Sequence, residues 1–216
     1  KGNSMKAIIN SLALSLLLIT AALAGGFNID SKGEQTFSFK DKAGRNQATF
    51  FSTTPLEDIT GMSSDVWGSV SFNIEDVQNT LKGEVLISTA SLKSGIELRD
   101  EHIRGAEWLD AEKFPNISFN IKKVTAIEKV EDNKLTVKVL GEFTVRGVTK
   151  EIPSEVELVY LEESDLTKMR APGDLLGVRA KLNITLADYG VQHMALGKKV
   201  ADEIEISVNI VGSNKM

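Results

Sequence analysis

The feature that most constrains the fold of this chain is a strict alternation of apolar and polar side chains. In residues 135–145, Leu135, Val137, Val139, Phe143 and Val145 fall on one face of an extended strand, with mostly polar neighbours between them. Period-two alternation indicates a strand with one buried face and one solvated face. Further runs of this kind, together with shorter predicted strands, occupy residues 27–40, 48–52, 66–74, 85–89, 117–121, 152–160, 176–186 and 204–210.

About eight such strands, joined mostly by short turns, predict a single antiparallel sheet. An open sheet of this length exposes two unpaired edges, so closure into a barrel is favoured. We therefore predict an all-β fold, a closed antiparallel eight-stranded barrel, with residues 25–216 forming one domain. The hydrophobic fraction of 42% and the charged fraction of 25% are those of an ordinary globular domain, and the length allows a sizeable core.

Residues 91–119 form the one long segment with a helix signal. Ser94 followed by Glu97 matches a capping box, and Pro115, which cannot donate a backbone hydrogen bond, should end the helix upstream. We predict a short charged helix lying across one end of the barrel. Thr54 followed by Glu57 matches a second capping box and predicts one or two helical turns between strands.

Three segments resemble motifs of one family. RDEHIRGAEWLDAEKFPNISF (99–119) resembles a signature of the YceI-like family of bacterial polyisoprenoid-binding proteins, GEFTVRGVTK (141–150) resembles a second, and DYG (188–190) a third. The resemblance covers residues 27–211 in the family's order. It implies a lipocalin-like β-barrel, an apolar lipid ligand such as a polyisoprenoid, and a homodimer. One position departs from the pattern: Leu186 stands where the family often has arginine.

A barrel of eight strands is either filled by its own side chains or holds one small ligand. The small inward residues Gly68, Thr89, Gly141 and Ala180 favour a cavity, and the resemblance favours it further. We predict binding, transport or storage of an apolar lipid; the alternatives are another amphiphile, such as a fatty acid or fatty amide, and a structural or partner-binding module with a filled barrel. The predicted interior residues are Phe37, Phe39, Val70, Phe72, Val85, Ile87, Phe119, Ile121, Val137, Val139, Phe143, Val178, Ala180, Leu182 and Ile184.

Charged residues of the predicted helix offer a polar counterpart to that interior. Arg99, His102 and Arg104 are candidate contacts for a diphosphate or another polar head group, because cations bind phosphate oxygens strongly. The alternative is a solvated helix face with internal ion pairs, in which His102 is a packed, hydrogen-bonded histidine. The residues alone leave both interpretations open.

Composition argues against several other functions. The net formal charge is −5 and no basic run is interleaved with aromatic residues, so a nucleic-acid partner is not expected. The chain has no cysteine, and its two histidines, His102 and His193, stand outside any zinc-binding motif, so we predict neither a metal site nor a cofactor. It has no G-x-S-x-G or P-loop motif, and we predict no enzymatic activity.

The first 24 residues have the pattern of a leader. We interpret residues 1–4 as a cloning remnant and Met5 as the start of a signal peptide whose apolar run covers 12–24. That run is short for a membrane span, which needs about 20 residues. Cleavage after Ala24 predicts a periplasmic or secreted protein, with a transient membrane or lipid-donor contact. Gly26 stands where a lipoprotein requires cysteine, so we expect no lipid anchor.

Overall fold

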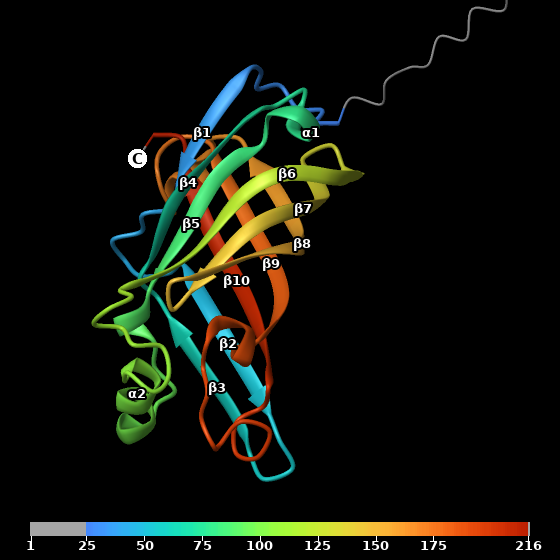
Figure 1. Cartoon of the computed structure of the whole chain (residues 1–216). Helices are drawn as coiled ribbons and strands as arrows, with labels where there is room; N and C mark the ends of the chain where they lie inside the picture. The colour runs from blue at the N-terminus through green and yellow to red at the C-terminus, as the bar shows by residue number, and fades with distance from the viewer. Residues whose placement is uncertain (1–24, 216) are drawn as a thin grey trace, which may run out of the picture.

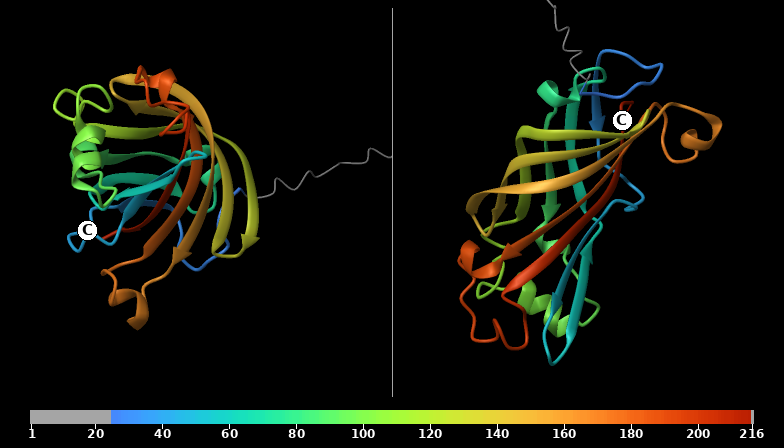
Figure 2. Two further views of the ribbon diagram at one scale, coloured as in Figure 1. Left: turned by 90° about the horizontal axis from the view of Figure 1, so that it is seen from below. Right: turned by 90° about the vertical axis from the view of Figure 1, so that its right-hand side faces the viewer.

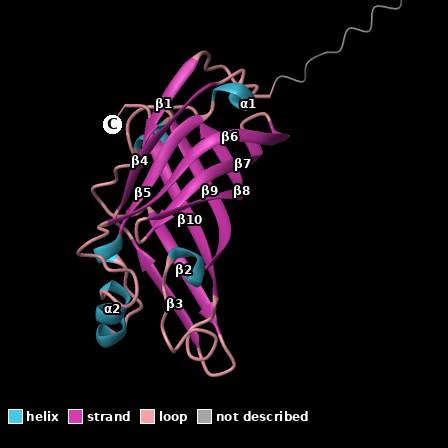
Figure 3. Cartoon of the chain, viewed as in Figure 1, coloured by secondary structure: helices cyan, strands magenta, loops and turns pink. Residues whose placement is uncertain are grey.

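The computed structural model describes residues 25–215; the predicted leader and Met216 lie outside the described residues. Strands dominate, and the short helices lie at the ends of the sheet (Figure 1, Figure 3). The strands are β1 (Glu34–Ser38), β2 (Gln47–Thr53), β3 (Asp58–Ser63), β4 (Val66–Asn73), β5 (Lys82–Ser88), β6 (Asn116–Glu131), β7 (Lys134–Val145), β8 (Val148–Leu161), β9 (Leu175–Thr185) and β10 (Glu203–Ser213). The helices are α1 (Val77–Thr80), α2 (Glu97–Arg104) and α3 (Asp165–Lys168), with 3₁₀ turns η1 (Thr89–Ser91) and η2 (Leu186–Tyr189).

Eight of the strands close into an antiparallel barrel, which confirms the predicted fold class. Their order is β1-β4-β5-β6-β7-β8-β9-β10, and β10 returns to β1 at the pair Ser38–Ser213. β2 and β3 form a hairpin that pairs with the first part of β10, where Ala48 lies opposite Val208. The whole sheet therefore has ten strands, and the hairpin lengthens one wall of the barrel towards the end that carries α2 (Figure 2).

Buried Asn46 stabilises β10 at the point where its pairing with β2 ends and its pairing with β1 begins. Its Nδ2 donates to the carbonyl oxygens of Phe39 and Val211 at 2.7 and 3.2 Å, and its Oδ1 accepts from the Val211 amide at 2.9 Å. The side chain thus satisfies backbone groups of β10 that lie between the parts paired with β1 and with β2. Because of this substitute pairing, one strand can close the barrel and also carry the hairpin.

Side chains fill the end of the barrel that carries α1 and α3. Phe37, Phe72 and Tyr160 are at most 1% exposed, and the Phe37 ring centroid lies 5.7 Å from that of Phe72 and 5.5 Å from that of Tyr160. The Tyr160 hydroxyl donates to Asp174 Oδ2 at 2.6 Å. Burial, and then this carboxylate, raise the pKa of Tyr160, so the phenol stays protonated and remains a donor. Packed aromatic rings therefore occupy this half of the interior.

The start of α2 differs from the prediction. Its N-cap is Ile96, which makes no side-chain capping bond, and the helix ends at Arg104. Ser94 does not cap it; the Ser94 amide and hydroxyl donate to Asp100 Oδ1 at 2.5 and 2.7 Å. The predicted capping box was wrong because the carboxylate that receives Ser94 belongs to Asp100, one turn into the helix, and not to Glu97.

The second predicted helix start is a hairpin turn. β2 and β3 remain paired as far as Thr53 and Asp58, which leaves only residues 54–57 for the connection. The Thr54 hydroxyl accepts from the amides of Leu56 and Glu57, both at 3.3 Å. The prediction of helical turns was wrong because strand pairing on both sides leaves no length for them.

Candidate ligand-binding cavity

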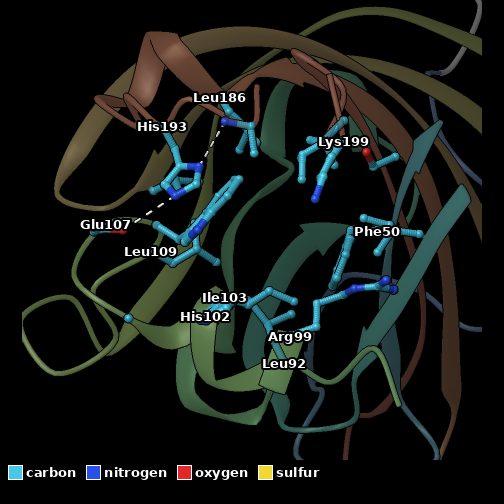
Figure 4. Close-up of a pocket in the computed structure, with 18 of the residues that line it drawn as sticks. Phe50, Leu92, Arg99, His102, Ile103, Glu107, Leu109, Leu186, His193 and Lys199 are labelled. Carbon is cyan, nitrogen blue, oxygen red and sulfur yellow. Dashed lines mark hydrogen bonds and ion pairs between the residues drawn. The ribbon is translucent and has the colours of Figure 1, made fainter. Parts of the chain in front are cut away.

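A cavity of about 1010 Å³ opens at the barrel end that carries α2. Its mouth is formed by α2, the β2–β3 turn and the loop at residues 191–202 (Figure 4). Binding sites for small molecules usually measure about 300–1,000 Å³ and are mostly apolar, so this cavity is large. Its wall includes Phe50, Ile87, Ile117, Phe143, Ile184 and Ile206.

The wall is apolar because the alternation of the strands continues to this end of the barrel. The cross-strand pairs Ile87–Ile117 and Ile184–Ile204 both line the cavity. Side chains that lie directly opposite each other on neighbouring strands point to the same face of the sheet and pack together. Each strand therefore presents an aliphatic or aromatic surface to the interior.

A buried carboxylate and an ion pair hold α2 at the mouth. Asp100, 8% exposed, accepts from Ser94 and so fixes the segment before the helix against it. These hydrogen bonds from Ser94, together with the charge of Arg104, lower the pKa of Asp100. On the other side, Arg99 Nη2 donates to Glu57 Oε2 at 2.7 Å. One ion pair therefore bridges α2 and the β2–β3 turn.

Arg146 joins the two segments that flank the mouth. It forms the two-residue turn between β7 and β8 with Gly147, at φ values of 52° and 72°. Positive φ at both positions is typical of a type I′ hairpin turn. The Arg146 guanidinium donates to the carbonyl oxygens of Ala106 at 2.8 Å and Gly190 at 3.0 Å. The turn thus positions the segment after α2 beside the start of the 191–202 loop.

The 191–202 loop supplies polar groups that the sequence prediction missed. The ring centroids of His193 and Trp108 lie 4.6 Å apart. His193 Nδ1 accepts from the Ala195 amide at 3.1 Å, and its Nε2 lies 3.5 Å from Glu107 Oε2 (Figure 4). The two ring nitrogens thus face different groups: Nδ1 faces the Ala195 amide and Nε2 faces Glu107. No periodicity or motif in the sequence marked this loop, which also brings Lys198 and Lys199 to the cavity.

The predicted interior residues are spread over the whole depth of the barrel. Ile87, Phe143 and Ile184 line the cavity. Most of the others lie deeper: buried in the core are Phe37, Phe39, Val70, Phe72, Val137, Val139 and Val178, and partly buried against it are Val85, Phe119, Ile121 and Leu182. Ala180 is half-buried. Alternation identifies the inward face of a strand but not how far along the barrel each residue lies.

The small inward residues do not create the cavity, contrary to the sequence argument. A Cβ on Gly141 would lie 2.3 Å from Cζ of Phe119, so that ring already occupies the space. Thr89 is 1% exposed and packed. Neither of these two lines the cavity, and nor do Gly68 and Ala180. The hollow arises instead from the longer wall that the β2–β3 hairpin and α2 build at this end.

The structure separates the three predicted head-group residues. Arg99 and His102 line the cavity, whereas Arg104 does not: its Nη1 donates to the Leu92 carbonyl at 3.5 Å. His102 is exposed at the mouth, so the alternative of a packed histidine was wrong. Leu186, at the position where the family often has arginine, is 8% exposed and lines the cavity. This departure makes the wall more apolar.

Within residues 25–215, no group of three or more histidine, cysteine, aspartate or glutamate side chains is placed to hold a metal ion. Over the same described residues, no helix combines the length and hydropathy needed to cross a membrane. What the lining offers chemically is apolar contact along the wall and charged groups at the mouth.

Comparison with solved structures supports the barrel. BcnA of Burkholderia cenocepacia has a TM-score of 0.58 at 19% identity, over 80% of this chain and 99% of BcnA. A polyisoprenoid binding domain from Saccharophagus degradans, implicated in plant cell wall breakdown, has a TM-score of 0.59 at 12% identity, over 85% of this chain and 99% of that domain. At these identities the likeness concerns the fold alone.

Sequence relatives match over almost the whole chain. An UPF0312 protein of Pseudomonas fluorescens is 29% identical over 211 residues, which are 96% of this chain and 98% of the relative. An UPF0312 protein of Vibrio vulnificus is 30% identical over 199 residues, which are 92% of this chain and 95% of the relative. The model of the YceI-like domain matches residues 28–212. The chain therefore belongs to the YceI-like domain family.

Proposed function

We propose that this protein binds an apolar lipid non-covalently, and that the lipid is a polyisoprenoid. The observation that carries the proposal is the cavity of about 1010 Å³ with its aliphatic and aromatic wall. Each buried CH₂ contributes about 0.8 kcal/mol, and association costs roughly 4–15 kcal/mol. A chain of roughly 5–20 carbons therefore offsets that cost without any polar contact.

The likeness to a domain described as polyisoprenoid binding supports the isoprenoid over other chains. A fatty acid or fatty amide is the second candidate, because Arg99, His193 and Lys199 place charged and polar groups at the mouth. A module with a filled barrel is disfavoured, since only the half that holds Phe37, Phe72 and Tyr160 is filled.

The proposal includes a transient contact of the mouth with a membrane or another lipid donor during loading. Leu56, Ile96, Leu98 and Met194 are 71%, 51%, 62% and 82% exposed, and all four line the cavity. They come from three separate segments of the chain that meet at the mouth. Clustered exposed apolar side chains mark interaction sites. If the mouth touches the membrane or another lipid donor, the lipid can pass from the donor into the cavity without crossing water.

Export to the periplasm or the exterior is the setting we propose for this activity. It is supported by the leader pattern in the first 24 residues. When the chain is expressed in a bacterium with a working secretion system, N-terminal sequencing of the exported product should begin at Gly25. A folded cytoplasmic product that keeps residues 12–24 would contradict this assignment.

Native mass spectrometry before and after organic extraction tests the lipid proposal. We expect a co-purifying lipid that extraction removes as one discrete mass. Two variants locate it: Ile184→Trp fills the cavity, whereas Val130→Trp adds the same ring at a position that is 48% exposed. Occupancy should fall in the first and not in the second. A native protein that neither carries nor takes up an isoprenoid or fatty-acyl lipid refutes the proposal.

A further inference from the structure

We propose that Lys198 and Lys199 form a binding site for an anionic head group, such as a diphosphate, on the lipid that the cavity holds. The inference rests on the proposed function, because it names the chemical class of the ligand's polar end. It also moves the head group away from Arg99, His102 and Arg104, the residues that the sequence had indicated.

A compact turn presents the two lysines. The Ala195 carbonyl accepts from the amides of Lys198, Lys199 and Val200 at 3.1, 2.9 and 3.1 Å. Gly197, at a φ of 68°, donates from its amide to the Val200 carbonyl at 2.8 Å and closes the turn. The backbone that carries the two lysines is therefore held by its own hydrogen bonds.

The turn is attached to the cavity wall. The Ala201 amide donates to Ser52 Oγ of β2 at 2.9 Å, and Ser52 is 2% exposed. Figure 4 shows the Lys199 nitrogen pointing into the space between Phe50 and the side that carries His193. Both lysines line the cavity, so a lipid whose chain lies along the apolar wall would bring its head group to them.

Neither lysine is engaged by a carboxylate in the part of the chain that the structure describes. The ion pairs there include neither Lys198 nor Lys199, whereas Arg99 is held by Glu57 at 2.7 Å. An anion can therefore bind the lysines without displacing an existing partner. Charge-assisted hydrogen bonds from ammonium groups to phosphate oxygens are the interaction that such a pair offers.

Carboxylates of the β2–β3 turn, of α2 and of the segment after α2 favour the same location. Glu57, Glu101 and Glu107 also line the cavity. Glu57 is neutralised by Arg99; the Glu107 side chain is 82% exposed and lies 3.5 Å from His193 Nε2. Glu101 on α2 makes no ion pair within residues 25–215 and repels an anion from the helix. The head group is therefore expected beside the 191–202 loop and not on α2.

The test compares probes that share one chain. Calorimetric titration of the delipidated protein at low salt uses geranylgeranyl diphosphate, geranylgeraniol and inorganic pyrophosphate. We expect the diphosphate to bind about tenfold more tightly than the alcohol, the size of two partly exposed ionic contacts. The double variant Lys198→Gln/Lys199→Gln should lose about that tenfold for the diphosphate and bind the alcohol unchanged.

The matched control is Lys123→Gln/Lys138→Gln. These lysines are exposed, belong to β6 and β7 and form no ion pair in the described chain, so the change in net charge is the same. If the native protein binds the diphosphate and the alcohol equally tightly, the head-group site is overturned while lipid binding stands. The same holds if both double variants lose the same affinity for the diphosphate. If inorganic pyrophosphate binds as tightly as geranylgeranyl diphosphate, the lysines form a site for free anions and the head-group site is also overturned. If neither lipid binds, the proposed function and this inference fail together.

Discussion

Arg99 of α2 and Glu57 of the β2–β3 turn form a charge-assisted hydrogen bond of 2.7 Å at the mouth of the cavity. Their side chains are 25% and 41% exposed. Ion pairs that are partly exposed contribute about 1 kcal/mol or less to the free energy of unfolding. The pair therefore matters less for folding than for how readily α2 and the hairpin separate when a ligand passes between them.

We predict that Arg99→Gln speeds ligand exchange several-fold, because it releases α2 from the hairpin, and lowers the free energy of unfolding by about 1 kcal/mol or less. Stopped-flow displacement of a fluorescent lipid measures the exchange rate. Lys122→Gln is the control: it breaks an ion pair of similar exposure with Glu142, 3.2 Å apart on the outer wall. Exchange rates that do not differ between the two variants show that the Arg99–Glu57 pair does not restrain the mouth.

The barrel was predictable because each strand carries its own evidence for a buried face. In β7, Leu135, Val137, Val139, Phe143 and Val145 are all buried, as the alternation indicates. Family motifs in the same chain pointed to the same fold. Nothing local, however, distinguishes Val137 from Phe143: one belongs to the packed core, and the other lines the cavity. That difference depends on which distant segments pack against each end of the barrel.

The mouth was predictable only in part. α2 was expected across one end of the barrel and lies there, but its contacts depend on two residues whose roles the sequence did not give. No capping pattern indicated Asp100, and the pattern that included Glu57 assigned it to a helix start and not to an ion pair with Arg99. The 191–202 loop reaches the cavity because Arg146 and Ser52 hold it there through long-range hydrogen bonds. Sequence spacing contains no signal for such contacts, so His193 and Lys199 were missed.

The two halves of the interior should respond differently to a buried charge. Ile184→Arg places the guanidinium at the cavity, where it can reach the mouth, so the protein should fold and lose its lipid. Val137→Arg places it in the packed half, at a position that is 0% exposed, and should destabilise the fold by about 3 kcal/mol or more. Circular dichroism melting and lipid occupancy, measured on both variants, distinguish these outcomes. Equal loss of stability in both contradicts the division of the interior.

Apolar residues at the mouth should govern contact with a lipid surface. Leu98→Glu/Met194→Glu removes two exposed side chains that line the cavity, and we expect several-fold weaker co-sedimentation with phosphatidylcholine vesicles that contain a polyprenol. The control is Leu166→Glu/Met169→Glu at α3, where the side chains are 77% and 81% exposed at the opposite end of the barrel (Figure 2). If both double variants bind the vesicles equally, the mouth is not the surface that meets the lipid donor.

Acid should weaken the fold through Asp41, which follows β1. Asp41 accepts from Arg45 Nε and Nη2 at 3.0 Å each and lies 3.2 Å from Arg170 Nη2. The hydrogen bonds from the Arg45 side chain are the main cause that lowers the pKa of Asp41 to about 2. This folded-state pKa lies below the unfolded value of about 3.9, so the ionised carboxylate stabilises the fold. That contribution is complete above about pH 4 and is lost as the pH falls towards 2.

Asp41→Asn should therefore lower the free energy of unfolding by about 2 kcal/mol at pH 7, and the deficit relative to the native protein should shrink between pH 4 and pH 2. Urea unfolding across that range measures it. Asp65→Asn is the control, because Asp65 is exposed and forms no ion pair within the described residues, and its effect should stay small at every pH. A deficit for Asp41→Asn that persists unchanged at pH 2 would mean that its carboxylate stabilises the fold by something other than its charge, since the native side chain is largely protonated below its own pKa.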